Sequence, residues 1–278
     1  MKNAPIGVFD SGVGGLTVLR GLLEGMPAER FIYLGDTARL PYGTKSATTI
    51  VRYALQAAKT LHDEGVKCLV VACNTAASVG LEAIRERFDD LPVIGVVEPG
   101  AEAACAASST SHIAVTATDR TVHEGAYQQA IRRRLPQARL SVRATPLFVA
   151  LAEEGLTEGP IAESVAQHYL GDLFNAGDPS MPDTLVLGCT HFPILKGAIR
   201  KVTGVATRIV DSASTITSAV RDGISGALAG GDDARPRDVR FLATDGIERF
   251  ARVGSRFLNR TVQPSEIELV ELKASITS

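Results

Sequence analysis

The chain has 278 residues, 45% of them hydrophobic and 22% charged, so it is long enough to bury the core of one large domain or of two moderate ones. The 29 Lys and Arg nearly balance the 31 Asp and Glu, and the net charge of −2 argues against a protein that holds nucleic acid through phosphate contacts. No apolar run approaches the roughly 20 residues that span a bilayer, and the early apolar stretch at 6–9 leaves no room for a signal peptide.

Short apolar segments alternate with longer amphipathic ones, the pattern of βαβ units around parallel sheets. The first half is predicted to contain strand 6–9, helix 16–25, strand 31–34, helix 46–64, strand 68–72, a helix that opens at Asn74, and strands 92–97 and 113–115. The second half is predicted to contain helix 123–135, strand 140–144, helix 161–174, strand 184–187, a helix at 193–201, and strands 208–210, 241–243 and 267–270. Turn-rich loops are expected at 176–182 and 230–236.

One α/β unit is repeated faintly within the chain. Residues 69–75 read LVVACNT and residues 185–191 read LVLGCTH, in each case an apolar strand, a small residue, a cysteine and polar residues that open a helix. A weaker likeness relates 6–11 to 113–118. The repeat predicts two similar α/β halves, each with a cysteine at the end of a strand.

The cysteines are the most informative residues. Cys68 and Cys105 are read as buried and inert, the usual state of a free cysteine. Cys73 and Cys189 follow strands and precede helices, where ligands bind in parallel α/β sheets and where a helix N-terminus favours a thiolate. Because no CxxC pair occurs, neither a disulfide framework nor a zinc site is expected, and the thiols indicate a cytoplasmic protein.

Polar residues beside these cysteines could bind a carboxylate. Asn74 and Thr75 follow Cys73, with helix capping as the alternative role, and Thr190 and His191 follow Cys189. Asp10 and Ser11 end the first strand, where a turn or cap is the alternative. The glycines at 12, 14 and 15 do not have the GxGxxG spacing of a dinucleotide site, and no cluster of metal ligands is apparent.

Two chemistries use a pair of thiols without a metal or cofactor. One is a redox pair, although such cysteines usually lie close in sequence. The other is proton transfer on both faces of one carbon, with one thiolate removing a proton while an opposite thiol supplies one. A duplicated α/β unit suits the second chemistry, since it places equivalent cysteines on either side of a cleft.

The chain resembles the glutamate racemase family, cofactor-independent amino-acid isomerases that supply D-glutamate for bacterial peptidoglycan. The resemblance covers nearly the whole chain and rests on a set of short motifs in a fixed order. They are IGVFDSGVGGLT at 6–17, GD at 35–36, PYG at 41–43, ACNT at 72–75, PLFV at 146–149 with Glu153, LGCTHFP at 187–193 and VDSA at 210–213.

The resemblance implies a two-base mechanism with named roles. Cys73 acts on D-glutamate with help from Asp10, and Cys189 acts on L-glutamate with help from His191 and Glu153, for which Glu154 is the adjacent alternative. The residues that it implies for substrate binding are Ser11, Tyr42, Gly43, Asn74, Thr75, Thr118, Thr121 and Thr190. It implies no metal and no cofactor.

The resemblance also implies a fold and partners. The fold is α/β, with two pseudo-symmetric α/β domains, mainly parallel sheets and the active site in the cleft between them. The first domain comprises 1–97 and 211–278, and the second comprises 98–210. L- and D-glutamate are the small-molecule partners, a homodimer is expected, and neither a membrane nor direct nucleic-acid binding is.

Three other functions stay open from sequence. Aspartate racemase uses the same cysteine pair on a substrate shorter by one methylene, a difference worth only about 1–3 kcal/mol of specificity. A binding or regulatory protein, such as the racemases that inhibit gyrase, would act through a protein partner. A dithiol redox enzyme would form a disulfide between Cys73 and Cys189.

Overall fold

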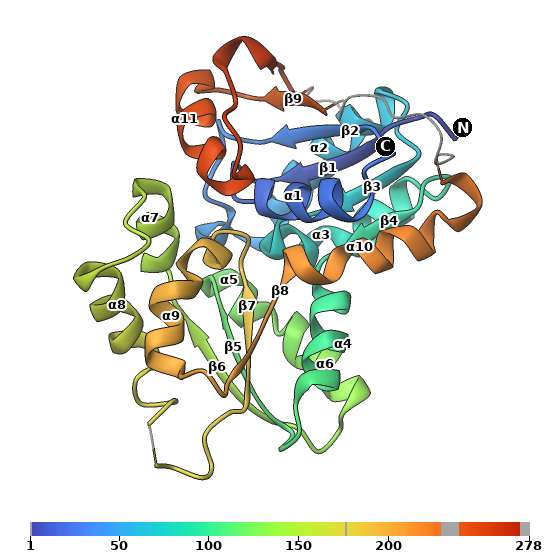
Figure 1. Cartoon of the computed structure of the whole chain (residues 1–278). Coiled ribbons are helices and arrows are strands. Elements are labelled where there is room, and N and C mark those ends of the chain that lie inside the picture. The colour runs from blue at the N-terminus through green and yellow to red at the C-terminus, as the bar shows by residue number, and fades with distance from the viewer. Residues whose placement is uncertain (1, 176, 229–238, 273–278) are drawn as a thin grey trace.

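The computed structural model describes residues 2–175, 177–228 and 239–272, which form two parallel sheets flanked by helices (Figure 1). The first sheet has the order β10-β9-β2-β1-β3-β4. Its strands are β1 (Ile6–Asp10), β2 (Phe31–Gly35), β3 (Cys68–Val71), β4 (Val93–Gly95), β9 (Val239–Ala243) and β10 (Ile267–Leu269). The second sheet has the order β6-β5-β7-β8, with strands β5 (His112–Ala117), β6 (Arg139–Ala144), β7 (Thr184–Gly188) and β8 (Arg208–Asp211).

The predicted repeat is confirmed by the topology. The order β2-β1-β3-β4 within the first sheet matches β6-β5-β7-β8 in the second, so β3 corresponds to β7 and β1 to β5. All neighbouring strands are parallel. The carboxyl ends of β3 and β7 therefore carry Cys73 and Cys189 at equivalent places.

The helices cover both faces of each sheet. Those that accompany the first sheet are α1 (Leu16–Gly25), α2 (Ala47–Asp63), α3 (Asn74–Arg87) and α11 (Ile247–Leu258). Those that accompany the second are α5 (Asp119–Glu124), α6 (Ala126–Arg134), α7 (Leu147–Glu154), α8 (Pro160–Leu170) and α9 (Lys196–Thr203). Two helices join the halves, α4 (Val97–Ala107) after β4 and α10 (Ser212–Gly223) after β8, and α10 packs on both α1 and α4. Short 3-10 turns lie at Tyr42–Thr44, Phe192–Leu195, Ser225–Ala227 and Pro264–Glu266.

Burial explains why these strands read as continuous apolar runs. Every residue of β1, β2, β3 and β7 is buried, as expected for a parallel sheet covered by helices on both faces. The amphipathic stripe of α2 likewise faces the core, and Ser46 caps its first turn by accepting from the Thr49 amide. In the described part of the chain, no helix is long and apolar enough to cross a membrane.

Several predicted boundaries are wrong for identifiable reasons. The predicted helix 123–135 is two helices, because Gly125 has φ +71° and breaks the chain direction between α5 and α6. The strand predicted at 92–97 ends at Gly95, since Val97 already opens α4. The helix predicted at 161–174 ends at Leu170, before Gly171. The helix predicted at 193–201 begins as the 3-10 turn Phe192–Leu195 and continues as α9.

Four helices lie in stretches for which the sequence pattern predicts none, namely α4, α7, α10 and α11. The loop predicted at 230–236 falls outside the described residues, as does Ala176 of the loop predicted at 176–182. The division into 1–97 with 211–278 and 98–210 stays a prediction. The sheets themselves draw their strands from 6–95 with 239–269 and from 112–211.

Candidate active site

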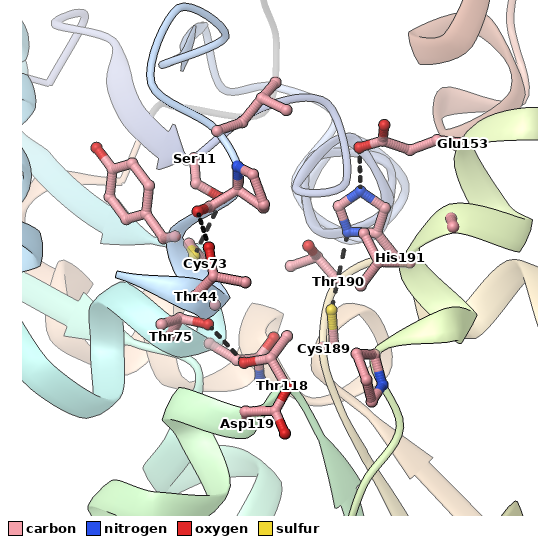
Figure 2. A pocket seen from close by; sticks show the side chains of 18 residues that line it. Ser11, Thr44, Cys73, Thr75, Thr118, Asp119, Glu153, Cys189, Thr190 and His191 are labelled. Atoms are coloured by element: carbon pink, nitrogen blue, oxygen red, sulfur yellow. Dashed lines mark hydrogen bonds and ion pairs between the residues drawn. The ribbon is translucent and has the colours of Figure 1, made fainter. Parts of the chain in front are cut away.

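A cavity of about 300 Å³ lies where the carboxyl ends of the two sheets face each other. Figure 2 shows Cys73 with Ser11 on one side of this cavity and Cys189 with His191 on the other. Its lining comprises Ser11, Leu40, Pro41, Tyr42, Gly43, Thr44, Cys73, Asn74, Thr75, Thr118, Asp119, Pro146, Val149, Ala150, Glu153, Cys189, Thr190 and His191. Two thiols from equivalent strand ends thus reach one cavity.

Cys73 is held at the start of α3. It is the N-cap residue, and its Sγ accepts from the Ala76 amide at 3.5 Å while the thiol donates to Ser11 Oγ at 3.4 Å. Burial and the nearby charge of Asp10 raise the pKa of Cys73 to about 12, against the lowering effect of the Ser11 and Ala76 contacts. The structure therefore favours a protonated thiol at this position.

Asp10 lies beneath the cavity lining and is fully buried. Its Oδ2 accepts from the Gly12 amide at 2.9 Å, and its Oδ1 accepts from the Thr190 hydroxyl at 3.4 Å. Burial raises the pKa of Asp10 above its ordinary value, although the His191 charge and these hydrogen bonds act in the opposite direction. A buried carboxylate with a raised pKa can accept a proton near neutral pH.

Cys189 has an imidazole beside it instead. Its Sγ lies 3.8 Å from His191 Nδ1, and His191 Nε2 lies 3.1 Å from Glu153 Oε1. Burial lowers the pKa of His191, but the contacts with Cys189 and Glu153 outweigh that effect and raise the pKa to about 10. The arrangement favours an imidazolium next to Cys189, which stabilises a thiolate there.

Glu153 and Glu154 are separated by geometry. Glu153 lines the cavity and contacts His191, whereas Glu154 is exposed. Burial raises the pKa of Glu153, but hydrogen bonds from His191 and Arg249 outweigh this and lower it. Of the two adjacent carboxylates, Glu153 is therefore the one placed to act on His191, and it does so in ionised form.

Three threonine hydroxyls meet at the side of the cavity opposite His191. Thr75 Oγ1 lies 3.1 Å from both Thr118 Oγ1 and Thr121 Oγ1, and the latter two are 3.1 Å apart. Thr75 is in the first turn of α3 and Thr118 caps α5, so two helix N-termini point their free amides into this region. Such a cluster can bind a carboxylate.

The turn Tyr42–Thr44 closes the cavity from the first half of the chain. The buried Tyr42 hydroxyl donates to the Asp36 carboxylate, which also accepts from Thr244 at 3.0 Å. Gly43 lies so close to Thr118 that a Cβ at this position would stand 2.8 Å from Thr118 Cβ. Gly43 thus lets main chain from the first half reach the polar cluster of the second.

A second close approach brings the two halves together near His191. A Cβ on Gly14 would stand 2.4 Å from His191 Nδ1 and 2.5 Å from Thr190 Oγ1. Thr17, in the first turn of α1, donates to the Thr190 carbonyl at 3.0 Å. The glycine-rich turn after β1 is therefore explained by its contact with the Cys189 side of the cavity and not by a bound phosphate.

Eleven of the thirteen predicted site residues line the cavity, while Asp10 and Thr121 lie behind it and contact lining residues. Tyr127 was not indicated by any motif, yet its buried hydroxyl accepts from Asn74 Nδ2 at 2.8 Å. Ser212 of the VDSA motif also accepts from that nitrogen, at 3.0 Å. Arg249, which contacts Glu153, lies in a helix that the sequence pattern did not predict.

The geometry can perform acid–base chemistry on a small anionic molecule. Thiols approach from opposite sides, each with its own polar neighbour, and hydroxyls and helix N-termini offer hydrogen-bond donors for carboxylates. Among residues 2–175, 177–228 and 239–272, no group of three or more His, Cys, Asp and Glu side chains is placed to hold a metal ion.

Comparisons with known proteins agree with this chemistry. The profile of the Asp/Glu/hydantoin racemase family matches residues 6–220. The chain is 45% identical to glutamate racemase of Geobacter metallireducens over 91% of this chain and 92% of that protein. Its structure is similar to glutamate racemase of Francisella tularensis in complex with D-glutamate, with a TM-score of 0.88, 35% identity, and 99% of this chain and 100% of the other covered. It is also similar to glutamate racemase isoform RacE1 of Bacillus anthracis, with a TM-score of 0.89, 32% identity and coverage of 98% and 99%.

Proposed function

The chain belongs to the Asp/Glu/hydantoin racemase family, and from that premise we propose how it interconverts L- and D-glutamate, with Cys73 and Cys189 transferring the α-proton on opposite faces of Cα. The activity, glutamate racemisation, is an isomerase reaction and the one that its full-length relatives are named for. The mechanism and the roles of individual residues are our proposal.

One observation carries this mechanism. Cys73 and Cys189 reach a single cavity from the ends of corresponding strands of two similar sheets. Inversion of a stereocentre needs a proton acceptor on one face of the carbon and a proton donor on the other. The duplicated unit supplies one thiol for each face.

The different surroundings of the two thiols favour L-glutamate as the first substrate. We assign Cys189, beside the His191 imidazole whose pKa is raised to about 10, the role of the base, and Cys73, whose pKa is raised to about 12, the role of the acid. The Cys189 thiolate removes the α-proton of L-glutamate, and the Cys73 thiol donates its proton to the opposite face. D-glutamate leaves behind a Cys189 thiol and a Cys73 thiolate.

The reverse direction begins from the other thiol. Asp10, a buried carboxylate with a raised pKa, accepts the proton of Cys73 and so prepares the thiolate that attacks D-glutamate. Transfer of a proton between the thiols and their carboxylate or imidazole neighbours returns the enzyme to its starting form. Each thiol therefore serves as base in one direction and as acid in the other.

The substrate's charged groups need partners, since deprotonation at Cα places negative charge beside a carboxylate. We assign the hydroxyls of Thr75, Thr118 and Thr121 and the N-terminus of α3 to a substrate carboxylate, as donors that stabilise this charge. Ser11, the Tyr42–Gly43 main chain, Asn74 and Thr190 complete the binding site.

The experiment that tests this function is incubation of the purified protein with L-glutamate in D₂O, without added cofactor. Optical rotation and the α-proton NMR signal are followed together. Two-face transfer predicts that both are lost while D-glutamate containing α-deuterium appears. Loss of optical rotation with retention of the α-proton would contradict the mechanism, and no change in either would contradict the function.

The same assay separates the alternative substrate. L-aspartate, shorter by one methylene, would bind with its second carboxylate displaced within the cavity. We expect L-glutamate to be the faster substrate. A dithiol redox role predicts instead a disulfide between Cys73 and Cys189 after mild oxidation, which non-reducing peptide mapping would detect.

The cellular role follows from the product. We propose that the D-glutamate formed is used in bacterial peptidoglycan synthesis and that the protein acts in the cytoplasm, where reducing conditions keep Cys73 and Cys189 as thiols. We also propose that it forms a homodimer, as the resemblance implies, and light scattering after size-exclusion chromatography would determine the mass.

A further inference from the structure

Helix α11 reaches from the first half of the molecule to the catalytic groups of the second. It follows β9 of the first sheet and lies next to α7, which follows β6 of the second sheet (Figure 1). Arg249 of α11 donates from Nη2 to Glu153 Oε2 at 2.6 Å. Arg256, two turns later, donates to the Glu153 carbonyl at 3.2 Å.

We propose that Arg249 is a positioning residue for the Cys189 half of the reaction, acting through Glu153 and His191. This inference rests on the proposed function, because it assigns a role within the same proton transfer. It adds a fourth member, drawn from a helix that accompanies the first sheet, to the series Cys189, His191 and Glu153.

The geometry of the Glu153 carboxylate supports this role. Oε2 is bound by Arg249 and Oε1 faces His191 Nε2 at 3.1 Å, so each oxygen has its own partner. The arginine fixes the rotation of the carboxylate and favours its ionised form. An ionised Oε1 accepts the Nε2 proton and leaves Nδ1 directed at Cys189, 3.8 Å away.

The remaining contacts of α11 explain why an exposed arginine can be effective. The Glu153 side chain is only 13% exposed, although that of Arg249 is 49% exposed. Arg256 fills the space beside Gly155, where a Cβ would stand 2.5 Å from its Nη1, and so holds the end of α7. Phe257 packs edge-on against the His191 ring, with centroids 5.1 Å apart. One face of α11 thus fixes both members of the Glu153–His191 pair.

Among the residues that the structure describes, Asp10 on the Cys73 side has no arginine in the place of Arg249. Asp10 is held by the Gly12 and Gly15 amides and the Thr190 hydroxyl, and none of these lies on α11. Loss of Arg249 should therefore slow proton transfer at Cys189 and leave transfer at Cys73 nearly unchanged. Because the two enantiomers of glutamate have equal free energies, kcat/KM must nevertheless fall by the same factor in both directions.

Kinetic isotope effects distinguish the two half-reactions. Removal of deuterium from Cα of L-glutamate reports on Cys189, and its removal from D-glutamate reports on Cys73. If the Cys189 step alone is slowed, it becomes more rate-limiting in both directions. The isotope effect on kcat/KM then rises for [2-²H]L-glutamate and falls towards one for [2-²H]D-glutamate.

The test compares Arg249→Gln and Arg249→Lys with Arg252→Gln, which removes an exposed arginine of the same helix. For Arg249→Gln we expect kcat/KM to fall about tenfold, the lower end of the effect of removing the outer partner of a metal-bound histidine, together with the opposite changes in the two isotope effects. Arg249→Lys keeps the charge and should recover most of the activity. Arg252→Gln should match the wild type.

Two results would overturn the proposed role of Arg249. Unchanged isotope effects, or equal changes with both substrates, would overturn the positioning role even if kcat/KM falls, because general loosening of the cavity slows both transfers. Unchanged kcat/KM would also overturn it. Thermal unfolding followed by circular dichroism confirms that the variants fold. Wild-type protein without racemase activity would contradict the proposed function itself, and the inference with it.

Discussion

Cys73 follows β3 and lies beside a serine hydroxyl and near a buried carboxylate, whereas Cys189 follows β7 and lies beside an imidazole that pairs with Glu153. The two positions correspond in the repeated fold, but the neighbouring charges differ in sign. Asp10 raises the pKa of Cys73, adding to the effect of burial. His191, with its own pKa raised to about 10, places a positive charge beside Cys189.

The difference shows what duplication and divergence each contribute to the site. Duplication supplies two thiols that face one cavity, as inversion of a stereocentre requires. In the mechanism that we propose, the diverged neighbours let Cys73 act as the acid while Cys189, beside an imidazolium, acts as the base. Two identical surroundings would not distinguish the acid from the base.

Removal of either thiol should lower racemisation the most, because the proposed mechanism needs both thiols. Cys73→Ser and Cys189→Ser are each expected to lower racemisation by at least about a thousandfold, since a serine hydroxyl is a far weaker acid and its neighbours cannot ionise it. Racemisation of L-glutamate, followed by circular dichroism, measures the loss. Cys105→Ser, in α4 and outside the cavity, is the control. Full turnover by either single variant would refute the two-thiol mechanism.

Replacement of Asp10 or His191, the groups that assist the two thiols, should affect the two proton transfers differently. Asp10→Asn and His191→Gln are each expected to lower kcat/KM by about 100-fold, the lower range for general acid–base groups. With [2-²H]L-glutamate the isotope effect should rise for His191→Gln and fall for Asp10→Asn. With [2-²H]D-glutamate the pattern should be reversed. The same response in both variants would mean that the helpers are not assigned to separate thiols.

Much of the fold could be predicted from the chain itself. The strands of a parallel sheet are buried on both faces, so β3 and β7 read as continuous apolar runs, and their likeness indicated the repeat. The break within 119–134 was missed because Gly125 interrupts the helix without interrupting the apolar pattern on either side. Helix α7 was missed because its eight residues are too few to establish a helical period.

The residues of the candidate site also differ in whether the sequence could predict them. Residues adjacent to a strand end, such as Cys73 with Asn74 and Cys189 with His191, are placed by the chain locally and could be predicted. Glu153, Tyr127 and Arg249 reach the site only when separate elements pack together. A family motif identified Glu153, but Tyr127 and Arg249 carry no local signal of their contacts.

A smaller effect is expected from the cluster of Thr75, Thr118 and Thr121 hydroxyls, because it binds substrate in both directions of the reaction. Thr75→Val keeps the shape of the side chain but removes the hydroxyl shared with Thr118 and Thr121, so KM for glutamate should rise about tenfold through loss of a hydrogen bond to a charged group. Thr217→Val, on α10, is the matched control because its hydroxyl donates to the Gly21 carbonyl and Thr217 does not line the cavity. A change in the isotope effects would show instead that Thr75 acts in one proton transfer.

The difference between the halves also predicts separate pH windows for stability. The pKa of His191 is about 10 in the folded protein, against about 6.5 when unfolded, so its proton stabilises the fold fully below pH 6.5 and this stabilisation is lost between pH 6.5 and about 10. The pKa of Asp10 is also raised, but from 3.8, so its contribution begins to fall at a lower pH. Urea unfolding from pH 4 to 10 should show the free energy of unfolding of the wild type decreasing relative to His191→Gln by at most about 1.4 kcal/mol per pH unit, and only in the upper window. His62→Gln, on the surface at the end of α2, is the control. A constant difference between wild type and His191→Gln would mean that the imidazole is not held as a cation by Cys189 and Glu153, and that the charges beside the two thiols do not differ in sign.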